Sequence, residues 1–435
     1  MYFSEDKIFG RKYNNKINIP NKDFDKTVGK NKKSGSTLGN LPSARAGHPY
    51  RMQISRDLFQ SNLKAIDSLE GLEKTGLHFF PDKKQITGVP KKSGSFDLLF
   101  NIREYNESGK EQMSTHTLKL IVEEDYNFPL DEVDESDPYW KPDEDVCAVP
   151  VNKDGKTRLK KDMVAASMRG FRQIEKGKIR EDDFNIQYDP KTRWYALAVS
   201  DGAGKSKFSR KGSEIACDSA VKSILDRLKA QSKSLKKLTI KYSRRKSEHV
   251  RKEIIGRLHD VIARSATDAY SNIVDEAARQ KHEPADFATT LLLCICKKFE
   301  FGWLIGAFGV GDGAICAYQK NKWYANLMGG MESPPEKYFL TTPGIIQPSE
   351  LERRICFTII DDFSALFLMT NGVSNPKFGC ASDMPCFELW DKFWDELNSQ
   401  VDFSGKINDV GEELLKWLGF WTPGKNDDRT IAVLF

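Results

Sequence analysis

Apolar residues between positions 150 and 435 occur in two kinds of pattern, which predict different elements. Apolar runs of strand length, bounded by turn residues, cover residues 193–200, 289–297, 303–309, 314–319, 356–360, 365–369 and 430–434. Apolar residues at every third or fourth position, the spacing of an amphipathic helix, mark residues 213–231, 254–277 and 388–397. Because few helices separate the strands, the pattern favours an α+β fold with antiparallel sheets and helices packed outside them.

The first 149 residues predict a different organisation. Residues 1–40 are rich in Lys, Asn, Gly and Ser without an apolar period, which predicts a disordered basic tail. Short alternating runs in residues 41–125 predict a small all-β sandwich of immunoglobulin type. The string GLHFFPDKKQITGVPKKSGSFDLLFNI resembles the immunoglobulin-like or cadherin-like modules of bacterial multidomain proteins. Residues 126–149, rich in Pro and acidic residues, predict a linker to a domain at 150–435.

The composition predicts a cytoplasmic protein. Charged residues make up 30% and apolar residues 39% of the 435 positions, and no apolar run approaches the roughly 18–20 residues that would span a bilayer. The first residues, MYFSEDKIFGRK, lack the apolar core of a secretion signal. The eight cysteines form no CxxC pair and several lie in apolar runs, which favours free thiols in a reducing compartment.

Charge is unevenly distributed along the chain. The net charge of +5 is too small to argue for nucleic acid, and no nucleic-acid motif accompanies it, so that class of partner is not favoured. Residues 1–40 and 221–261 are strongly basic, and residues 131–145 are acidic. A solvated helix face is one interpretation of the basic block, and a docking surface for an acidic partner is the other. The role of the basic insert at 231–252 stays open.

Polar residues that can bind a metal stand where strands are expected to begin or end. They are Asp182, Asp201, Asp312, Asn371 and Asp427. Taken singly, each could be an ordinary turn or helix cap. Taken together, carboxylates delivered from several strand ends to one place are what Mg²⁺ or Mn²⁺ needs, because these ions prefer oxygen ligands. The six histidines show no zinc-site spacing.

Six blocks occur in an order that matches a known family. They are GFRQIEKGKIREDDF, YALAVSDGAG, DFATTLLL, FGVGDGA, LFLMTNGV and NDDRT. In this order they resemble the metal-dependent Ser/Thr phosphatases of the protein phosphatase 2C type, in a bacterial branch. The resemblance implies an antiparallel β-sandwich flanked by helices on both faces. It also implies hydrolysis of phosphoserine or phosphothreonine by a water held between two Mn²⁺ or Mg²⁺ ions, with a third ion more weakly bound.

The resemblance assigns a role to each matching position. Asp201 corresponds to the residue that bridges both metals, and the backbone carbonyl of Gly202 contacts one of them. Asp182, beside Glu181, and Asp427 complete the metal shells, so that Asp182, Asp201 and Asp427 are the catalytic set. Asp312 corresponds to the residue of the third metal. Phosphate is assigned to Arg172, with Arg169 and Arg180 as weaker candidates, because the position aligned with the family's arginine is Gln173.

Asn371 departs from the family, which has Asp there. An amide keeps one carbonyl oxygen but loses the charge, so it binds a divalent ion more weakly. Asn371 is either an introduced inactivating change, a native residue of a slow or metal-hungry enzyme, or the mark of a pseudophosphatase that binds phosphoproteins without turnover. The first two are favoured jointly over the third. A phosphorylated protein substrate and a partner Ser/Thr kinase are the partners that the resemblance implies.

Overall fold

The chain divides into two compact units, one within residues 16–129 and the other containing residues 130–435, and each is described by itself. The computed structural model describes residues 41, 44–47, 50–54, 62–105, 110–123, 137–152, 160–175, 177–329, 338–378, 387–420, 422 and 426–435. The predicted tail at 1–40 lies outside the described residues.

The N-terminal unit is built from β-strands. Its four-stranded sheet has the order β1 (Ala44–Arg45), β7 (Glu111–Glu123), β6 (Gly94–Tyr105), β3 (Asn62–Glu70), and its three-stranded sheet has the order β2 (Tyr50–Gln53), β5 (Gln85–Gly88), β4 (Leu77–Phe80). Side chains of both sheets, among them Phe100, Leu118 and Ile86, share one buried core. The region is therefore β-rich, and its immunoglobulin-like character stays a prediction.

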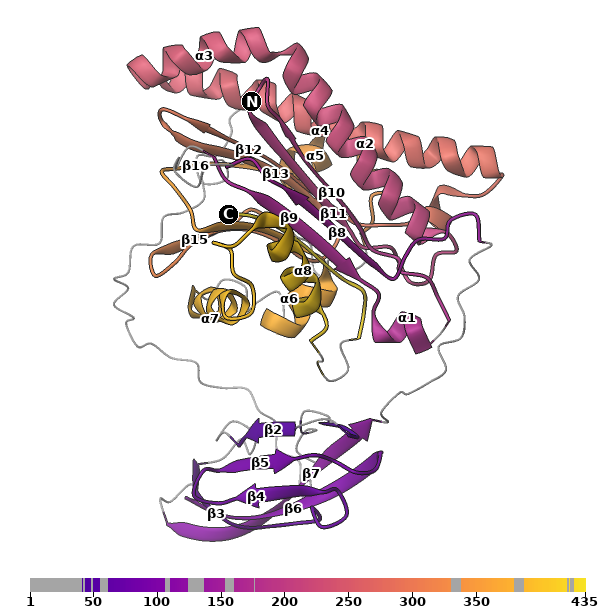
Figure 1. The fold of residues 1–435 in the computed structure, drawn as a ribbon, viewed down its shortest axis with the longest axis vertical. Helices are drawn as coiled ribbons and strands as arrows, with labels where there is room; N and C mark the ends of the chain where they lie inside the picture. The colour runs from indigo at the N-terminus through magenta and orange to yellow at the C-terminus, as the bar shows by residue number, and fades with distance from the viewer. Residues whose placement is uncertain are drawn as a thin grey trace, which may run out of the picture. The chain divides into compact units, whose positions relative to one another are not determined.

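The larger unit contains two antiparallel sheets among its described residues (Figure 1). The five-stranded sheet runs β10 (Asp183–Asp189), β11 (Trp194–Ser200), β12 (Leu291–Phe299), β13 (Gly302–Val310), β16 (Ile355–Ile360). The six-stranded sheet runs β15 (Trp323–Asn326), β14 (Ala314–Gln319), β17 (Ala365–Met369), β18 (Arg429–Leu434), β9 (Met163–Met168), β8 (Glu144–Val149).

The two sheets pack face to face, and the alternation of side chains along each strand explains why. In β11, Leu197 and Val199 point into the core between the sheets, together with Leu368 and Leu434 of the other sheet. The alternate residue Ala198 points outward into a second core shared with helices. Both faces of β11 are thus buried, which accounts for its uninterrupted apolar sequence. The mixed α+β class is as predicted.

Helices cover the outer face of each sheet (Figure 1). The helices are α1 (Phe171–Glu175), α2 (Ser209–Ala230), α3 (Ser232–Arg245), α4 (Glu248–Gln280), η3 (Pro284–Phe287), α5 (Pro348–Arg354), α6 (Asn371–Phe378), α7 (Phe387–Asn398) and α8 (Ile407–Leu418). In α2 the buried Ala216, Ala220, Ile224 and Leu228 recur at every fourth position, which gives the helix one apolar face against the five-stranded sheet.

The structure differs from the sequence prediction at the expected linker 126–149. Residues 144–149 form strand β8, which pairs along its whole length with β9 in the six-stranded sheet. Upstream of it, the ammonium group of Lys141 is buried against the carbonyl oxygen of Asp182. This end of the expected linker is therefore part of the larger unit. No helix in the described ranges has the length and apolar character needed to cross a membrane.

Candidate functional site

The strand registers bring the predicted site residues to one end of the two sheets. Asp183 pairs with Ser200, so that Asp182 and Asp201 lie next to each other at the end of the β10–β11 pair. In the other sheet, Ile431 pairs with Met369, which places the segments carrying Asp427 and Asn371 side by side. Asp312 lies in the turn between β13 and β14, and Ala314 pairs with the same Met369.

Four carboxylates converge around Asp201. Its pKa is held well above the usual range by burial and by the negative charges of Asp182, Asp427, Asp312 and Asp428. Burial and the charge of Asp428 likewise raise the pKa of Asp182. The negative charges of neighbouring carboxylates repel one another. Protonation or a bound cation relieves this repulsion.

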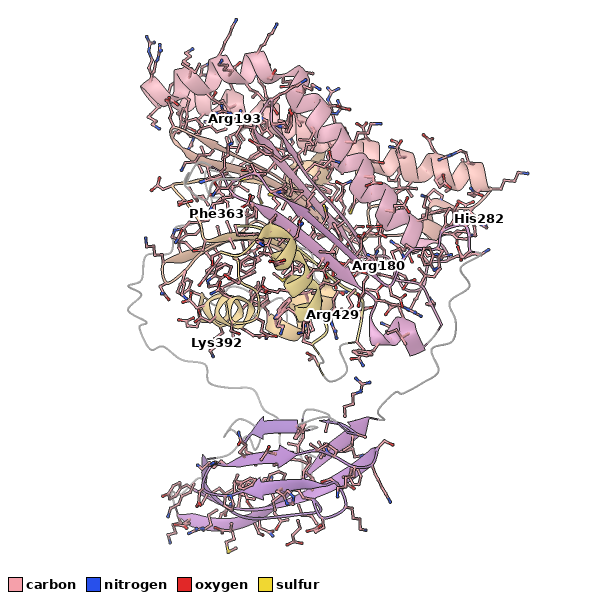
Figure 2. All side chains as sticks on the ribbon, in the orientation of Figure 1. Arg180, Arg193, His282, Phe363, Lys392 and Arg429 are labelled. Carbon is pink, nitrogen blue, oxygen red and sulfur yellow. The ribbon has the colours of Figure 1, made fainter. Side chains whose placement is uncertain are left out.

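Asp182 is fully buried and links the two sheets. Its Oδ2 accepts hydrogen bonds from the hydroxyls of Thr370 at 2.8 Å and Thr430 at 2.9 Å. Its backbone carbonyl accepts from the Nη1 of Arg180 and the Nζ of Lys141, both at 3.0 Å. Arg180 is 1% exposed and lies at the site end of the sheets (Figure 2). Asp182 is therefore held in one position by neighbours from several separate segments of the chain.

Asp428 was not predicted to be a site residue, but its carboxylate holds the loops of the site together by hydrogen bonds. Its Oδ1 accepts the backbone N–H of Gly170 at 2.6 Å, and its Oδ2 accepts those of Glu181 at 2.5 Å and Asp182 at 3.4 Å. Burial raises its pKa to about 6 against the opposing effect of these backbone donors. The sequence contained a signal for Asp428, because two acidic residues stand side by side in NDDRT. Only the first of them, Asp427, was predicted to be a site residue.

Gln173 joins two acidic residues of the site. Its buried Nε2 donates to Asp427 Oδ1 at 2.7 Å and to Glu181 Oε2 at 3.4 Å. Glu181 also accepts the hydroxyl of Ser209 at 2.9 Å on Oε1. The family resemblance places an arginine at this position, but here a neutral amide lies between two carboxylates. It donates a hydrogen bond to one oxygen atom of each carboxylate.

Arg172 is half-exposed and reaches the site from its rim. Its Nη1 lies 3.6 Å from Asp427 Oδ2, and 56% of its side chain is open to solvent. Arg169, by contrast, is 5% exposed and donates to Asp143 and to the carbonyl of Gln173. Of the three arginines considered for phosphate binding, Arg172 alone has an accessible guanidinium.

Asn371 and Asp312 form a pair. Asn371 is the first residue of α6, and its Nδ2 donates to Asp312 Oδ2 at 3.0 Å. The next residue, Gly372, is enclosed by the closing block, because a Cβ added there would lie 1.8 Å from the carbonyl oxygen of Asp428. The start of α6 is therefore fixed against the loop that carries Asp427 and Asp428.

Gly202 lets the backbone pass close to Glu181. A Cβ at Gly202 would lie 2.6 Å from the Glu181 carbonyl oxygen, so a side chain is excluded. The neighbouring Asp201 is held by its backbone, whose N–H donates to Thr290 Oγ1 at 2.8 Å and whose carbonyl accepts the Thr289 hydroxyl. The negative charges of the other aspartates of the site act on the Asp201 carboxylate.

The donor set suits a hard divalent cation in chemistry. The side chains of Asp182, Asp201 and Asp427 offer oxygen atoms, and their mutual repulsion is the condition that a cation relieves. In the described ranges, however, no group of three or more His, Cys, Asp or Glu side chains is arranged to hold an ion. The amides of Gln173 and Asn371 occupy carboxylate oxygens that an ion would otherwise use.

Comparison with known proteins identifies a related family. The sequence profile described as "Protein phosphatase 2C" matches residues 169–419, or 251 of the 435 positions, and so ends before Asp427. None of the curated proteins compared with the chain matches it.

Solved structures similar to this chain include those of three phosphatases. A bacterial serine phosphatase is 13% identical, with 62% of this chain and 96% of that chain covered and a TM-score of 0.38. The serine-threonine phosphatase 2C from Toxoplasma gondii is 12% identical, with 68% and 99% covered and a TM-score of 0.41. The catalytic domain of serine threonine protein phosphatase PstP, in complex with two manganese ions, is 14% identical, with 62% and 96% covered and a TM-score of 0.33.

Proposed function

Because the chain belongs to the protein phosphatase 2C family, we propose that it is a metal-dependent phosphatase that hydrolyses phosphoserine or phosphothreonine in a protein substrate. The observation that carries the proposal is the convergence of Asp182, Asp201, Asp312 and Asp427 at one end of the two sheets, where their negative charges act on one another. A partner Ser/Thr kinase would supply the substrate. The free cysteines among the described residues support a reducing, cytoplasmic location.

Two Mn²⁺ or Mg²⁺ ions are the proposed cofactors. Asp201 would bridge them, with Asp182, Asp427 and the carbonyl of Gly202 as further ligands. Asp312 and Asn371 would border a third, weaker position. When bound, the ions would polarise a phosphoryl oxygen and acidify the attacking water.

The chain's own residues would orient this arrangement and bind the substrate. Asp428 holds the backbone of Gly170 and Glu181, so that the loops on either side of the site keep their spacing. Arg172, with its accessible guanidinium, would bind the phosphate of the substrate through charge-assisted hydrogen bonds. Its ion pair with Asp427 would open as the phosphate arrives.

The Asn371–Asp312 pair favours a second candidate function. An amide that already satisfies Asp312 reduces the need for an ion at the third position. Together with Gln173 between Asp427 and Glu181, this favours a pseudophosphatase that binds phosphoproteins as a scaffold without turnover. We place it second because four aspartates still converge.

A phosphatase assay separates the two candidates. The chain and its Asn371→Asp variant are incubated with p-nitrophenyl phosphate and with a phosphothreonine peptide over a range of Mn²⁺ concentrations. Metal-dependent turnover by the chain, increased at low Mn²⁺ by Asn371→Asp, is expected. If both proteins stay inert at saturating Mn²⁺ while the phosphopeptide binds, the enzyme proposal fails and the scaffold proposal holds.

The N-terminal unit is proposed to be an immunoglobulin-like module that spaces or binds rather than catalyses. Two sheets around one core support this, as does the resemblance of residues 76–102 to such modules. The proposed boundaries are a basic tail at 1–40, the module at 41–125, a linker beginning at 126, and the phosphatase domain at 150–435 with β8 added to it.

A further inference from the structure

A cavity of about 1200 Å³ lies at the opposite end of the larger unit's sheet from the aspartates. Strand β10 connects the two places, because it starts next to Asp182 and ends at Asp189, just before the turn at 190–193 that lines the cavity. Six residue steps of about 3.3 Å put these ends about 20 Å apart. Figure 2 shows Arg193 near α3, and Arg180 and Arg429 toward the other end of the sheets. The cavity is therefore separate from the candidate metal centre.

Cationic side chains from several segments line this cavity, and they are Lys160, Lys191, Arg193, Lys236, Lys297 and Lys298. The acidic side chain in the lining is Glu300. Within the described part of the chain, no carboxylate forms an ion pair with any of these cations. Elsewhere in the same unit, exposed arginines such as Arg257 and Arg264 are paired with acidic neighbours. The lining thus carries more positive than negative charge, although the nearby Asp189 carboxylate offsets part of it at Lys297.

Lys297 shows the electrostatic consequence. Its Nζ donates to the carbonyl oxygen of Thr192 at 2.7 Å and lies over the rings of Trp194 and Phe299. Burial, with the positive charge of Arg193 next in importance, lowers its pKa to about 8. Cations that repel one another in a half-enclosed space are stabilised by an anion placed among them.

Helix α3 forms one long wall of the cavity, and Ile240 is the exposed apolar side chain of that wall. The residues of α3 that line it recur at the three- and four-residue spacing of one helix face, and they are Ser232, Leu235, Lys236, Thr239, Ile240 and Ser243. Eleven helical rises of about 1.5 Å make this wall about 16 Å long, which an extended peptide of about five residues would cover. Ile240 is 43% exposed. The shape suits an extended segment better than a compact anion.

The aromatic rings at the cavity argue against single-stranded nucleic acid. Binding of bases needs open ring faces for stacking. Trp194 is 2% exposed and meets Phe299 edge-on with ring centroids 5.9 Å apart. Phe299 is itself stacked on Phe301 at 5.0 Å, and Tyr188 lies 4.7 Å from Tyr195. These rings already have protein partners on the faces that bases would use.

We propose that this cavity binds an extended acidic segment of a partner protein, in which acidic side chains alternate with apolar ones. Alternate side chains of an extended peptide point to opposite sides. Acidic side chains would then meet the lysines of the rim while an apolar one packs against the exposed Ile240. The binding does not require catalysis at Asp201, and a bound partner would be held about 20 Å from the metal centre by the length of β10.

The test uses the full chain and fluorescence anisotropy of a short labelled peptide in which Glu alternates with Leu. Lys191→Glu combined with Lys236→Glu reverses two charges of the lining. The matched control combines Lys237→Glu with Lys241→Glu, two exposed residues of the same helix outside the lining. Both double variants should keep the thermal midpoint of the parent, since all four side chains lie at the surface.

The lining variant is expected to weaken peptide binding about tenfold or more, and the control variant by less than about threefold. Added salt should weaken binding to the parent. An equal loss in both variants would mean that general positive charge, not the cavity, binds the peptide, and would overturn the proposal. So would a parent that does not bind the peptide, or that binds inorganic triphosphate or a single-stranded oligonucleotide more tightly at the lining residues.

Discussion

The side-chain amide of Asn371 donates a hydrogen bond to a carboxylate oxygen of Asp312 over 3.0 Å. A carboxylate at position 371 could not donate this bond, and two negative charges at that distance would repel each other. The pair is therefore stable without an ion, whereas an Asp–Asp pair would need a cation or a proton between its members. This difference makes the effect of Asn371 on metal binding measurable by stability as well as by activity.

Asn371→Asp should make the stability of the chain depend more strongly on metal. Without divalent ions, we expect the variant to lose roughly 1–2 kcal/mol of unfolding free energy, because a hydrogen bond is replaced by repulsion. Saturating Mn²⁺ should restore the loss, since an ion bound to the native state raises its stability. Thermal unfolding with EDTA and with Mn²⁺ measures both effects.

Asn398→Asp is the matched control, because it makes the same chemical change at an exposed position at the end of α7. It should change stability little and show no added response to Mn²⁺. If the two variants respond alike, the repulsion at Asp312 is not the cause, and the Asn371–Asp312 pair has no special role in metal binding.

The metal-free chain should lose stability as pH rises from about 4 to 7. Burial raises the pKa of Asp428 to about 6, and the pKa values of Asp182 and Asp201 also lie well above their usual range. The folded state therefore binds more protons than the unfolded state in this window, so the free energy of unfolding falls with rising pH. Mn²⁺ favours the charged carboxylates and should flatten or reverse the trend.

Asp428→Asn should weaken this pH dependence in two ways, because it removes the titration of residue 428 and also the charge that helps to raise the pKa of Asp182. The variant cannot titrate at position 428, so its stability should fall less steeply with pH than that of the parent in EDTA. His259, whose pKa burial lowers, titrates in both proteins and cancels in the difference. Parallel pH curves for the parent and the variant would contradict a raised pKa at Asp428.

Arg172→Ala should weaken substrate binding without unfolding the protein. The guanidinium is half-exposed and its ion pair with Asp427 is long at 3.6 Å, so its loss should change stability by less than about 1 kcal/mol. We expect KM for a phosphopeptide to rise about tenfold, because a charged partner of the phosphate is removed. Arg264→Ala, at an exposed arginine of α4, should leave KM unchanged. Equal KM values for the parent and Arg172→Ala would exclude Arg172 as a phosphate ligand.

The sequence predicted most of the strands whose residues are buried on both faces, but it did not predict β9, whose short MVAASM sequence is rich in Ala and Ser. Residues 289–297 and 303–309 are continuous apolar runs, and they correspond to β12 and β13. Strand β10 was missed because its DFNIQYD sequence alternates polar and apolar residues over a short span and begins with the acidic residues of the site. Strand β8 was missed because its acidic start resembles the linker before it. In both strands, the polar and acidic residues obscured the two-residue alternation of apolar positions that marks a strand.

The sequence predicted which positions meet at one end of the two sheets, whereas it did not predict their hydrogen-bond partners. Asp201 is marked by the apolar strand that ends just before it, which the sequence pattern reveals. Asp182 was found through the family resemblance of its block, because the strand that follows it was not predicted. The amide of Gln173 meets Asp427 across 254 positions of the chain, and no local pattern encodes such a contact. The contacts of the buried Lys141 could not be predicted for the same reason, since its hydrogen-bond partners lie more than 40 positions away in the chain.

Lys141 provides the last prediction, which concerns the segment that was expected to be a linker. Its Nζ lies 2.9 Å from Asp183 Oδ2 and also donates to the carbonyl oxygen of Asp182 and to the hydroxyl of Ser213. Lys141→Met should cost about 3 kcal/mol of unfolding free energy, because the Asp183 carboxylate stays buried without its partner. Asp183→Asn in the same chain should recover part of the loss, since a neutral amide needs no counter-charge. Urea unfolding of the parent, both single variants and the double variant measures the coupling. Additive losses would show that Lys141 and Asp183 act independently, and the segment before β8 would then contribute packing alone.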